Sequence, residues 1–583
     1  MKTRALLPGG LAAISLLATC GGCLSLLPVT DFESALRHLE GDLLPRIQID
    51  NSEPRPAGTL AMAGAALPLA ERLPPPEAYP LQGIAGRGAT AGGSLPVEIV
   101  SSVEKADAAR PDRRWLVQVA ERFNQRGERS DGGRRIEVRI RTIPSGLAAQ
   151  MLAAGTLRPA GYSPASEQWL ELLRQQGVPT RRLRARLVGN GSVIALRNQA
   201  WRRLGAHGSP TFAGVVDQAL AGRLRMGYCN PYICSPGLDF LHTLLWLSAG
   251  HSRDGKALTA ADLQSDGVSR SFALFQQSLT STAPTYLEMV ETWRRNPSGF
   301  DAMVMAHQTY LRLKREPGFG DLQTVPFGSP QDSPLAALPW TTAEQRQALE
   351  RFAAFATSPA MQELARQADY SQAPPVPPEA RPPRADGDLL SQAQRQWKRR
   401  KDGRRTVYMQ LVIDRSGSMQ EHGRMHQLKK AVSLATAAIN PGNQVGLISF
   451  SDHPQRHLAL QPYDNNVRNR LLAAVSELQP DGPTALYDGL AVAMADLMRA
   501  RRRDPSGRFV VLLLTDGNRT EGLALNDLKP VLRHSAITVL PIAYGEVNQG
   551  ELSDIAAIRE GAVYQGTPER IVPLINDLLQ TNL

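Results

Sequence analysis

Cysteine, aromatic residues and long apolar runs are all scarce in this sequence. Of the four cysteines only Cys229 and Cys234 lie beyond residue 23, and aromatic side chains make up 5% of the chain. Beyond the N-terminal stretch no segment resembles a transmembrane helix, which excludes a protein with many membrane spans. The arginines are spread along the whole chain, so no basic and aromatic strip forms of the kind that binds nucleic acid.

The chain does contain enough apolar residues for several cores. Hydrophobic residues make up 42% of its 583 residues, and the formal net charge of +11 is moderate for this length. At about 150 residues per domain, such a length indicates two to four domains. We therefore expect an ordinary globular protein with more than one domain, and not a disordered one.

The first 23 residues have the pattern of an export signal. A basic start precedes an apolar stretch that is too short to span a bilayer comfortably, and small residues follow. The letters LATC, which end at Cys20, resemble a bacterial lipoprotein signal, in which the cysteine is lipidated after cleavage. Cys23 after Gly22 is a competing site, and a plain secretory signal or an uncleaved anchor are alternatives. We expect an exported cell-envelope protein, anchored by lipid in the periplasm or on the outer surface.

The two remaining cysteines lie five positions apart, in the stretch CNPYIC. In an oxidising compartment Cys229 and Cys234 can close a small disulfide loop. The alternative is a pair of separately buried thiols.

Two stretches rich in proline and glycine divide the chain. We assign a signal, a tether, an N-terminal body, a linker and a C-terminal body to residues 1–23, 24–94, 95–370, 371–405 and 406–583. The linker combines prolines with a basic run, as solvated interdomain segments do. Within the linker, a short helix at 388–397 is expected to dock on a neighbouring domain.

In the C-terminal body, continuous apolar strands alternate with helical patterns. The runs VYMQLVI at 407–413 and FVVLLL at 509–514 are typical of strands that are buried on both faces. This alternation predicts an α/β fold, with a Rossmann-like, doubly wound and mostly parallel sheet. In such sheets ligands bind beyond the carboxyl ends of the strands.

Polar side chains follow both of these strands. Asp414 comes directly after the first run, and Asp516 follows the second with one threonine between. In an extended segment Asp414, Ser416 and Ser418 point to one side, and Gly417 allows a tight turn. We expect the two carboxylates and the serine hydroxyls to meet on a surface loop at one edge of the sheet.

Carboxylate and hydroxyl oxygens without a nearby histidine or cysteine ligand favour a hard cation. We expect Mg²⁺ first, with Mn²⁺ or Ca²⁺ next. Thr484, in the stretch GPTALYDG, lies in a loop directly before a helix. Its hydroxyl can cap that helix or turn toward the metal as a further ligand.

Together these residues resemble a known family. The stretch DRSGS with Asp414, Ser416 and Ser418, the loop residue Thr484 and the TDG turn with Asp516 are similar to the metal-ion-dependent adhesion site, or MIDAS, of von Willebrand factor A domains. The resemblance covers essentially all of 406–583. It implies that the hydroxyls coordinate the ion directly, that the aspartates often act through waters, and that an acidic residue of a protein partner completes the coordination.

The N-terminal body is predicted to be a second α/β unit. Strand, short Ser/Gly turn and helix follow one another at Ser102, Ser145, Ser163 and Ser235. Free amides at a helix start attract anions, so these turns can bind a small anionic or polar solute. In the alternative interpretation the serines only cap helices.

The order of these turns resembles the bacterial extracellular solute-binding proteins, which have a two-lobed α/β fold of the periplasmic-binding-protein type. The stretches LVGNGSVIAL, NPYICSPGL and GFDAMVMAHQTYL carry the same resemblance, over about 95–370. His307 and Gln308 stand where the family often has a glutamate, and QADYSQAP replaces its usual C-terminal motif. The resemblance therefore implies a solute pocket whose ligand has changed or been lost.

Three functions follow from these features. The first is a cell-envelope binding or adhesion protein with a MIDAS and a solute-binding-like body. The second is a solute-binding component of an ABC-type transport system with an accessory A domain. The third, an envelope enzyme, is disfavoured because no nucleophile, base and orienting group fall at matching strand ends.

Overall fold

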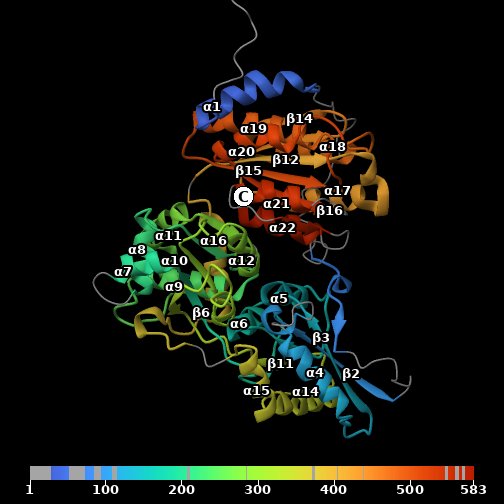
Figure 1. Cartoon of the computed structure of the whole chain (residues 1–583). Coiled ribbons are helices and arrows are strands. Elements are labelled where there is room, and N and C mark those ends of the chain that lie inside the picture. Colours follow the sequence, from blue (N-terminus) through green and yellow to red (C-terminus); the bar gives the residue numbers. More distant parts are fainter. Residues whose placement is uncertain are drawn as a thin grey trace, which may run out of the picture.

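The structure is a computed structural model of the chain. It describes residues 28–51, 73–83, 93–107, 114–205, 210–283, 285–370, 374–403, 405–436, 439–544, 549–558, 563–566 and 571–582. The lipidation sites expected at Cys20 and Cys23 lie outside these residues. Figure 1 shows a C-terminal body, coloured orange to red, that rests against one of two further lobes.

The first lobe is built on a mixed sheet with the strand order β1-β3-β2-β4-β11-β5. Its centre is parallel, because β2 pairs in parallel with both β3 and β4. The strands are β1 (Leu81–Gln82), β2 (Ser94–Ser101), β3 (Arg135–Thr142), β4 (Gly161–Ser163), β5 (Arg181–Arg184) and β11 (Leu335–Ala337). The helices are α3 (Val103–Ala106), α4 (Trp115–Gln125), α5 (Ser145–Ala153), α6 (Glu167–Gln175), α14 (Ala343–Ala356) and α15 (Pro359–Gln367).

The second lobe has its own mixed sheet, in the order β10-β6-β9-β7-β8. Its strands are β6 (Ser192–Leu196), β7 (Met226–Cys229), β8 (Ser281–Ala283), β9 (Ala302–Ala306) and β10 (Gln323–Phe327). Its helices are α7 (Asn198–Leu204), α8 (Phe212–Leu220), α9 (Ser235–Ser248), α10 (Ala260–Gln264), α11 (Asp266–Ser278), α12 (Tyr286–Arg295) and α13 (His307–Leu313). The chain returns to the first lobe at β11, so the predicted two-lobed α/β arrangement is confirmed.

Cys229 and Cys234 lie in the second lobe, between the end of β7 and the start of α9. The structure pairs them as a disulfide, with a Cα–Cα distance of 6.1 Å. Both side chains are buried in the same apolar cluster as Trp293 and Tyr286. The bridge closes the turn that leads into α9.

The linker forms the helix α16 (Gly387–Arg400), after the short turn η6 (Pro378–Ala380). Leu390 joins the apolar core of the first lobe, and Trp397 joins that of the second lobe. The Trp397 indole nitrogen donates a hydrogen bond of 2.6 Å to the Tyr228 hydroxyl. The helix therefore packs against both lobes.

The C-terminal body has a six-stranded sheet in the order β14-β13-β12-β15-β16-β17, parallel except for β14. The strands are β12 (Val407–Asp414), β13 (Gln444–Phe450), β14 (Pro454–Pro462), β15 (Arg508–Thr515), β16 (Thr538–Tyr544) and β17 (Tyr564–Gly566). The helices are η7 (Gly417–Gly423), α17 (Arg424–Ala435), α18 (Asn465–Glu477), α19 (Leu486–Arg503), α20 (Leu525–His534), α21 (Gln549–Ile558) and α22 (Ile571–Asn582). The predicted doubly wound sheet is confirmed.

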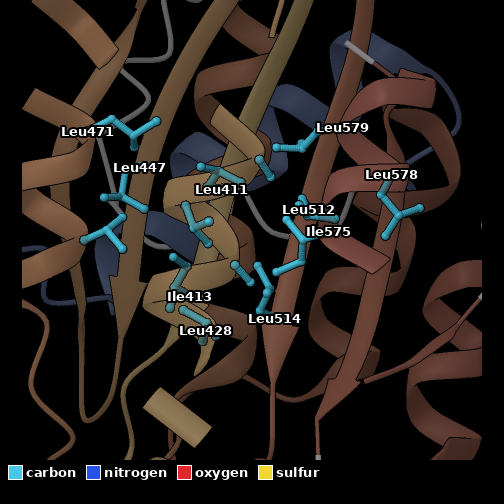
Figure 2. Packing of buried hydrophobic residues seen from close by; sticks show 14 of the residues in the cluster. Leu411, Ile413, Leu428, Leu447, Leu471, Leu512, Leu514, Ile575, Leu578 and Leu579 are labelled. Carbon is cyan, nitrogen blue, oxygen red and sulfur yellow. The ribbon is translucent and has the colours of Figure 1, made fainter. Parts of the chain in front are cut away.

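Successive residues of a strand point to opposite faces of the sheet. Helices pack on both of these faces. Leu411 and Ile413 pack with Leu428 and Ile575 from the helices of one face, as Figure 2 shows. Val412, between them in the sequence, joins the cluster on the other face. Each fully buried residue of this size contributes roughly 1.5–3 kcal/mol relative to an exposed one.

Part of the segment expected to be a tether is folded. The helix α1 (Phe32–His38) continues through the turns η1 (Leu39–Leu43) and η2 (Leu44–Arg46). Asp31 caps the helix, and Leu36, Leu39 and Leu43 are buried in the same apolar cluster as α19 and α20. In Figure 1 the blue helix α1 lies along the orange C-terminal body. Residues 76–82, which form η3 (Pro76–Ala78) and β1, belong instead to the first lobe.

Candidate functional site

The carboxyl ends of β12 and β15 bring the two predicted aspartates to one edge of the sheet. The strands are parallel neighbours, with Ile413 opposite Leu514. Asp414 therefore ends one strand, and Asp516 directly follows the other. The loops after these strands carry the remaining predicted ligands.

Asp414 is fully buried, and Ser416 is 2% exposed. The Asp414 carboxylate accepts hydrogen bonds from the Ser416 backbone N–H at 2.8 Å and the Thr515 hydroxyl at 2.6 Å. Burial raises the pKa of Asp414 to about 6, against the lowering effect of these hydrogen bonds. The expectation that both residues lie on a surface loop is therefore wrong for their side chains.

The two serine hydroxyls are adjacent. Ser416 Oγ lies 3.2 Å from Ser418 Oγ, and Ser418 Oγ donates to Asp516 Oδ1 at 2.7 Å. The backbone is extended only as far as Ser416, because the 3-10 helix η7 begins at Gly417. That turn brings Ser418 across to Asp516, so the oxygens converge by a bend and not along one strand.

Thr484 reaches the same edge from the loop before α19. The Gly417 backbone N–H donates to the Gly482 carbonyl at 2.9 Å, which fixes this loop against the DRSGS turn. A Cβ placed on Gly517 would lie 3.4 Å from Thr484 Oγ1 and 3.6 Å from Ser418 Oγ. The structure thus gathers all five predicted residues around one point near Gly517.

Arg424, at the start of α17, was not anticipated from the sequence. Its guanidinium donates to Asp516 Oδ2 at 2.8 Å and to the Ser418 carbonyl at 3.2 Å. Burial raises the pKa of Asp516, while the hydrogen bonds from Ser418 and Arg424 and the Arg424 charge lower it. The only feature of the sequence that could have indicated this contact is the position of Arg424 ten residues after Asp414. Whether Arg424 reaches Asp516 depends on how η7 folds.

The donor set fits a hard divalent cation. Two carboxylates with raised pKa values are held at the edge beside three hydroxyls, and Arg424 balances only one of the two negative charges. Among the residues that the structure describes, no group of three or more histidine, cysteine, aspartate or glutamate side chains forms a metal cluster. A site with two carboxylates and three hydroxyls lies outside that type of cluster.

The four serines of the N-terminal body also lie near one another, between the two lobes. Three of their hydroxyls have protein partners. Lys105 Nζ donates to Ser102 Oγ at 2.8 Å, the Ala165 N–H to Ser145 Oγ at 3.2 Å, and the Trp169 indole to Ser235 Oγ at 2.8 Å. Within the described residues, the buried Ser163 hydroxyl has no hydrogen-bond partner.

The lobes touch directly at these turns. The Gly146 N–H donates to the Ile233 carbonyl at 3.0 Å, and a Cβ on Gly146 would lie 2.0 Å from the Tyr232 carbonyl. Only glycine permits this approach. The structure therefore has the first and second lobes closed together at the starts of α5 and α9.

A cavity of about 320 Å³ lies between the start of α6, residues 329–334 and the linker. Its lining includes Ser166 and Gln168, each with a buried side-chain oxygen that lacks a hydrogen-bond partner among the described residues. Three arginines and three acidic residues also line it; they are Arg182, Arg381, Arg384, Glu167, Glu171 and Asp332. Its walls thus offer both charges and unpaired oxygens.

Two buried titratable groups near these turns were not anticipated from the sequence. Burial lowers the pKa of Lys105 to about 7 and raises that of Asp239 to about 7. Asp239 Oδ1 accepts from the Ser329 N–H at 2.9 Å, close to the cavity. His307 and Gln308 begin α13, where Gln308 is buried and donates to the Ala368 carbonyl at 3.2 Å.

The fold defines a protein of two α/β bodies. Residues 409–572 match the family described as von Willebrand factor type A domain, and residues 108–370 match the family described as bacterial extracellular solute-binding protein. The chain thus combines a solute-binding protein domain with a von Willebrand factor A (VWA) domain. Both are binding domains.

Curated relatives match short parts of the chain. An uncharacterized protein of Mycobacterium tuberculosis is 33% identical over 123 residues, which are 21% of this chain and 19% of that protein. The human collagen alpha-5(VI) chain is 24% identical over 160 residues, which are 26% of this chain and 6% of that protein. The chain spans about a fifth or less of the length of the curated relatives it matches.

Among solved structures, a von Willebrand factor type A protein from Catenulispora acidiphila is similar with 24% identity over 30% of this chain and 42% of that one, at a TM-score of 0.28. A periplasmic thiamin binding protein has 10% identity over 55% and 99% of the two chains, at a TM-score of 0.39. Iron-bound HitA from Pseudomonas aeruginosa has 17% identity over 53% and 99%, at a TM-score of 0.35.

The extracellular solute-binding domain indicates an exported protein. Among the described residues, no helix is both long enough and apolar enough to cross a bilayer.

Proposed function

We propose that this protein is a cell-envelope binding protein of adhesion type, whose VWA domain binds a protein or surface ligand through a divalent metal. Asp414, Ser416, Ser418, Thr484 and Asp516 would hold Mg²⁺, or Mn²⁺ or Ca²⁺ in its place. The observation that carries the proposal is the convergence of these side chains around one point near Gly517.

The charge balance of the site favours an acidic partner. Three of the five side chains are neutral hydroxyls, and Arg424 already offsets Asp516. A divalent ion held there keeps net positive charge and attracts a carboxylate from outside the chain. We therefore propose binding and not catalysis, with an aspartate or glutamate of a partner protein completing the coordination.

We propose a second binding role for the N-terminal body, toward a small polar or anionic solute. Three of the four predicted serines hydrogen-bond within the protein, so the cavity at Ser166, Gln168 and Arg384 supports this role better than the serine turns do. The alternative function, a solute-binding component of an ABC-type transporter with an accessory VWA domain, rests on the same cavity.

We further propose attachment to the bacterial envelope through a lipid at Cys20, or at Cys23. This follows from the sequence pattern and agrees with the extracellular solute-binding domain. It would hold both binding bodies outside the cytoplasmic membrane.

The test is retention of envelope proteins by the immobilised full chain, in Mg²⁺ and after removal of Mg²⁺ with a chelator. We expect retention that requires Mg²⁺ and is lost in Ser416→Ala, because that change removes a ligand hydroxyl. Ser433→Ala, on α17 away from the site, is the matched control. Retention that is unchanged by the chelator and by Ser416→Ala would contradict the adhesion role and favour the transport alternative.

A further inference from the structure

A second cavity, of about 220 Å³, lies where the second lobe, the end of the linker and the VWA domain meet. Thr280 and Thr282 line it from the second lobe, and Lys401 and Arg405 from the linker. Arg508, the first residue of β15, lines it from the VWA domain. Its volume is several times the ~30 Å³ that a water molecule occupies in the liquid.

The lining of this junction cavity is strongly basic. Among the residues that the structure describes, its lining contains four basic side chains and no carboxylate; the basic residues are Lys401, Arg405, Arg501 and Arg508. The Arg501 guanidinium lies 4.7 Å from the centre of the Phe32 ring, which leaves Lys401, Arg405 and Arg508 as the cations of the junction. The hydroxyl residues Thr280, Thr282 and Thr538 stand among them.

Two of these cations have buried donor atoms that are not used. The Lys401 side chain is 2% exposed, and Lys401 Nζ and Arg405 Nε have no hydrogen-bond partner among the described residues. Buried donors left unpaired cost about 1–3 kcal/mol each, and more when they are charged. Native structures seldom leave such groups without a partner.

The Asp402 carboxylate is the negative charge beside Lys401 and Arg405, but it does not pair closely with Lys401. Asp402 Oδ1 lies 3.9 Å from Lys401 Nζ, beyond hydrogen-bond distance, while Asp402 Oδ2 accepts from the Asn440 side chain at 3.2 Å. One carboxylate thus lies near the two cations with unused donors, Lys401 and Arg405. Burial, helped by the neighbouring Arg508 charge, lowers the pKa of Lys401 to about 7, and burial also lowers that of Arg405.

We propose that the junction cavity binds a small phosphate-type oxyanion, held by Lys401, Arg405 and Arg508. Such an anion supplies acceptors for the unused donors of Lys401 and Arg405 and adds negative charge beside these two cations. Its site is formed by all three segments together, so the bound anion fastens the VWA domain to the second lobe. Free inorganic phosphate and the phosphate of a small organic ester share this chemistry.

This site is separate from the proposed metal site. Arg508 begins β15, and Asp516 follows its last residue, Thr515. The eight-residue strand spans roughly 25 Å at about 3.3 Å per residue, so the two sites lie at opposite edges of the sheet. The anion proposal therefore stands whether or not the proposed function holds.

The experiment is a calorimetric titration of inorganic phosphate, and separately of glycerol 3-phosphate, into the full chain at constant ionic strength. Lys401→Met and Arg405→Gln remove one cation each, and Arg503→Gln, an exposed arginine of α19, is the control with the same charge change. We expect saturable binding that weakens about ten- to a hundredfold in both cavity variants and is unchanged in Arg503→Gln.

The two probes distinguish the two possible sources of the anion. Tighter binding of glycerol 3-phosphate supports an organic phosphate as the ligand, and equal binding of the two supports free phosphate. Arg405 is only half-buried, so Arg405→Gln keeps the test readable if Lys401→Met does not fold. The proposal is overturned if neither probe binds, or if Arg503→Gln weakens binding as much as Arg405→Gln does.

Discussion

Arg424 places a permanent positive charge inside the proposed metal site. Its guanidinium lies 2.8 Å from Asp516 Oδ2, and its side chain is 14% exposed. A divalent ion bound at the same edge must share Asp516 with it, and two positive charges a few ångströms apart repel each other. The residue therefore holds the carboxylate in place without metal and weakens metal binding at the same time.

Replacing Arg424 should strengthen metal binding. We expect Arg424→Gln to bind Mg²⁺ about three- to tenfold more tightly than the natural chain, because a repelling charge is removed and the site stays partly open to solvent. Lys430→Gln, on the exposed face of α17, is the matched control. A calorimetric titration measures both, and weaker binding in Arg424→Gln would show that the arginine supports the site.

His457 gives the VWA domain a pH dependence. It is buried in β14, and its Nε2 lies 2.7 Å from Ser449 Oγ. Burial, helped by the positive charge of Arg415, lowers the pKa of His457 to about 4 from an ordinary value of 6.5. Between these values the unfolded chain takes up a proton that the folded domain does not, so falling pH destabilises the fold.

We expect the free-energy difference between the natural chain and His457→Gln to fall by about 1–3 kcal/mol from pH 7 to pH 4. Asp414, whose raised pKa acts in the opposite direction, cancels because both proteins contain it. Hydrogen exchange of the β13 amides measures the stability of this domain, and His426→Gln serves as the exposed control. A difference that does not change with pH would contradict the account.

Among single residues, the sequence predicted which side chains of the VWA domain converge, but it did not predict their surroundings. Asp414, Ser416, Ser418, Thr484 and Asp516 follow from strand ends and a short motif, and all five converge. Arg424 and the Thr515 hydrogen bond to Asp414 depend on how loops fold in three dimensions. The spacing of residues along the chain does not predict such contacts.

The elements that connect the bodies are more ordered than their composition indicates. The proline-rich linker ends in α16, which joins the apolar cores of both lobes through Leu390 and Trp397. The tether contains α1, whose Leu36, Leu39 and Leu43 pack on the VWA domain. Average composition over a long window hides such short apolar stripes, although their helical spacing is visible in the sequence.

If α16 is part of the N-terminal body, Trp397→Ala should destabilise that body by about 3–5 kcal/mol, because a large buried side chain leaves a cavity. All seven tryptophans precede residue 406, so tryptophan fluorescence during urea unfolding follows this body alone. Arg395→Ala, exposed on the same helix, should change stability by less than about 0.5 kcal/mol. Equal stabilities of the two variants would contradict the assignment of α16 to the N-terminal body.

At the scale of the whole molecule, the VWA sheet separates two regions of opposite chemistry. Its carboxyl edge carries the aspartates and hydroxyls of the proposed metal site, and its amino edge meets the second lobe at the basic junction cavity. The edge with the proposed metal site thus lies opposite the edge that meets the second lobe. In Figure 1 the C-terminal body lies against the second lobe, whose residues line the junction cavity at the amino edge.

The general architecture followed from the sequence because alternating strands and helices, strand-end aspartates and Ser/Gly turns are local patterns. Two α/β bodies and their order were predicted and are confirmed. The closed contact at Gly146 and the junction cavity were not predicted, since residues from distant segments form both. Their positions depend on how whole bodies pack.

The most direct test of the central claim is a calorimetric titration of Mg²⁺ and Mn²⁺ into the full chain, beside Ser418→Ala and Ser433→Ala. Ser418 is only half-buried, so its hydroxyl can be removed with little effect on the fold, unlike the buried carboxylate of Asp414. We expect one bound ion in the natural chain and in Ser433→Ala, and a loss of at least about tenfold in affinity in Ser418→Ala. Absence of binding to the natural chain, or equal binding by Ser418→Ala, would contradict the central claim.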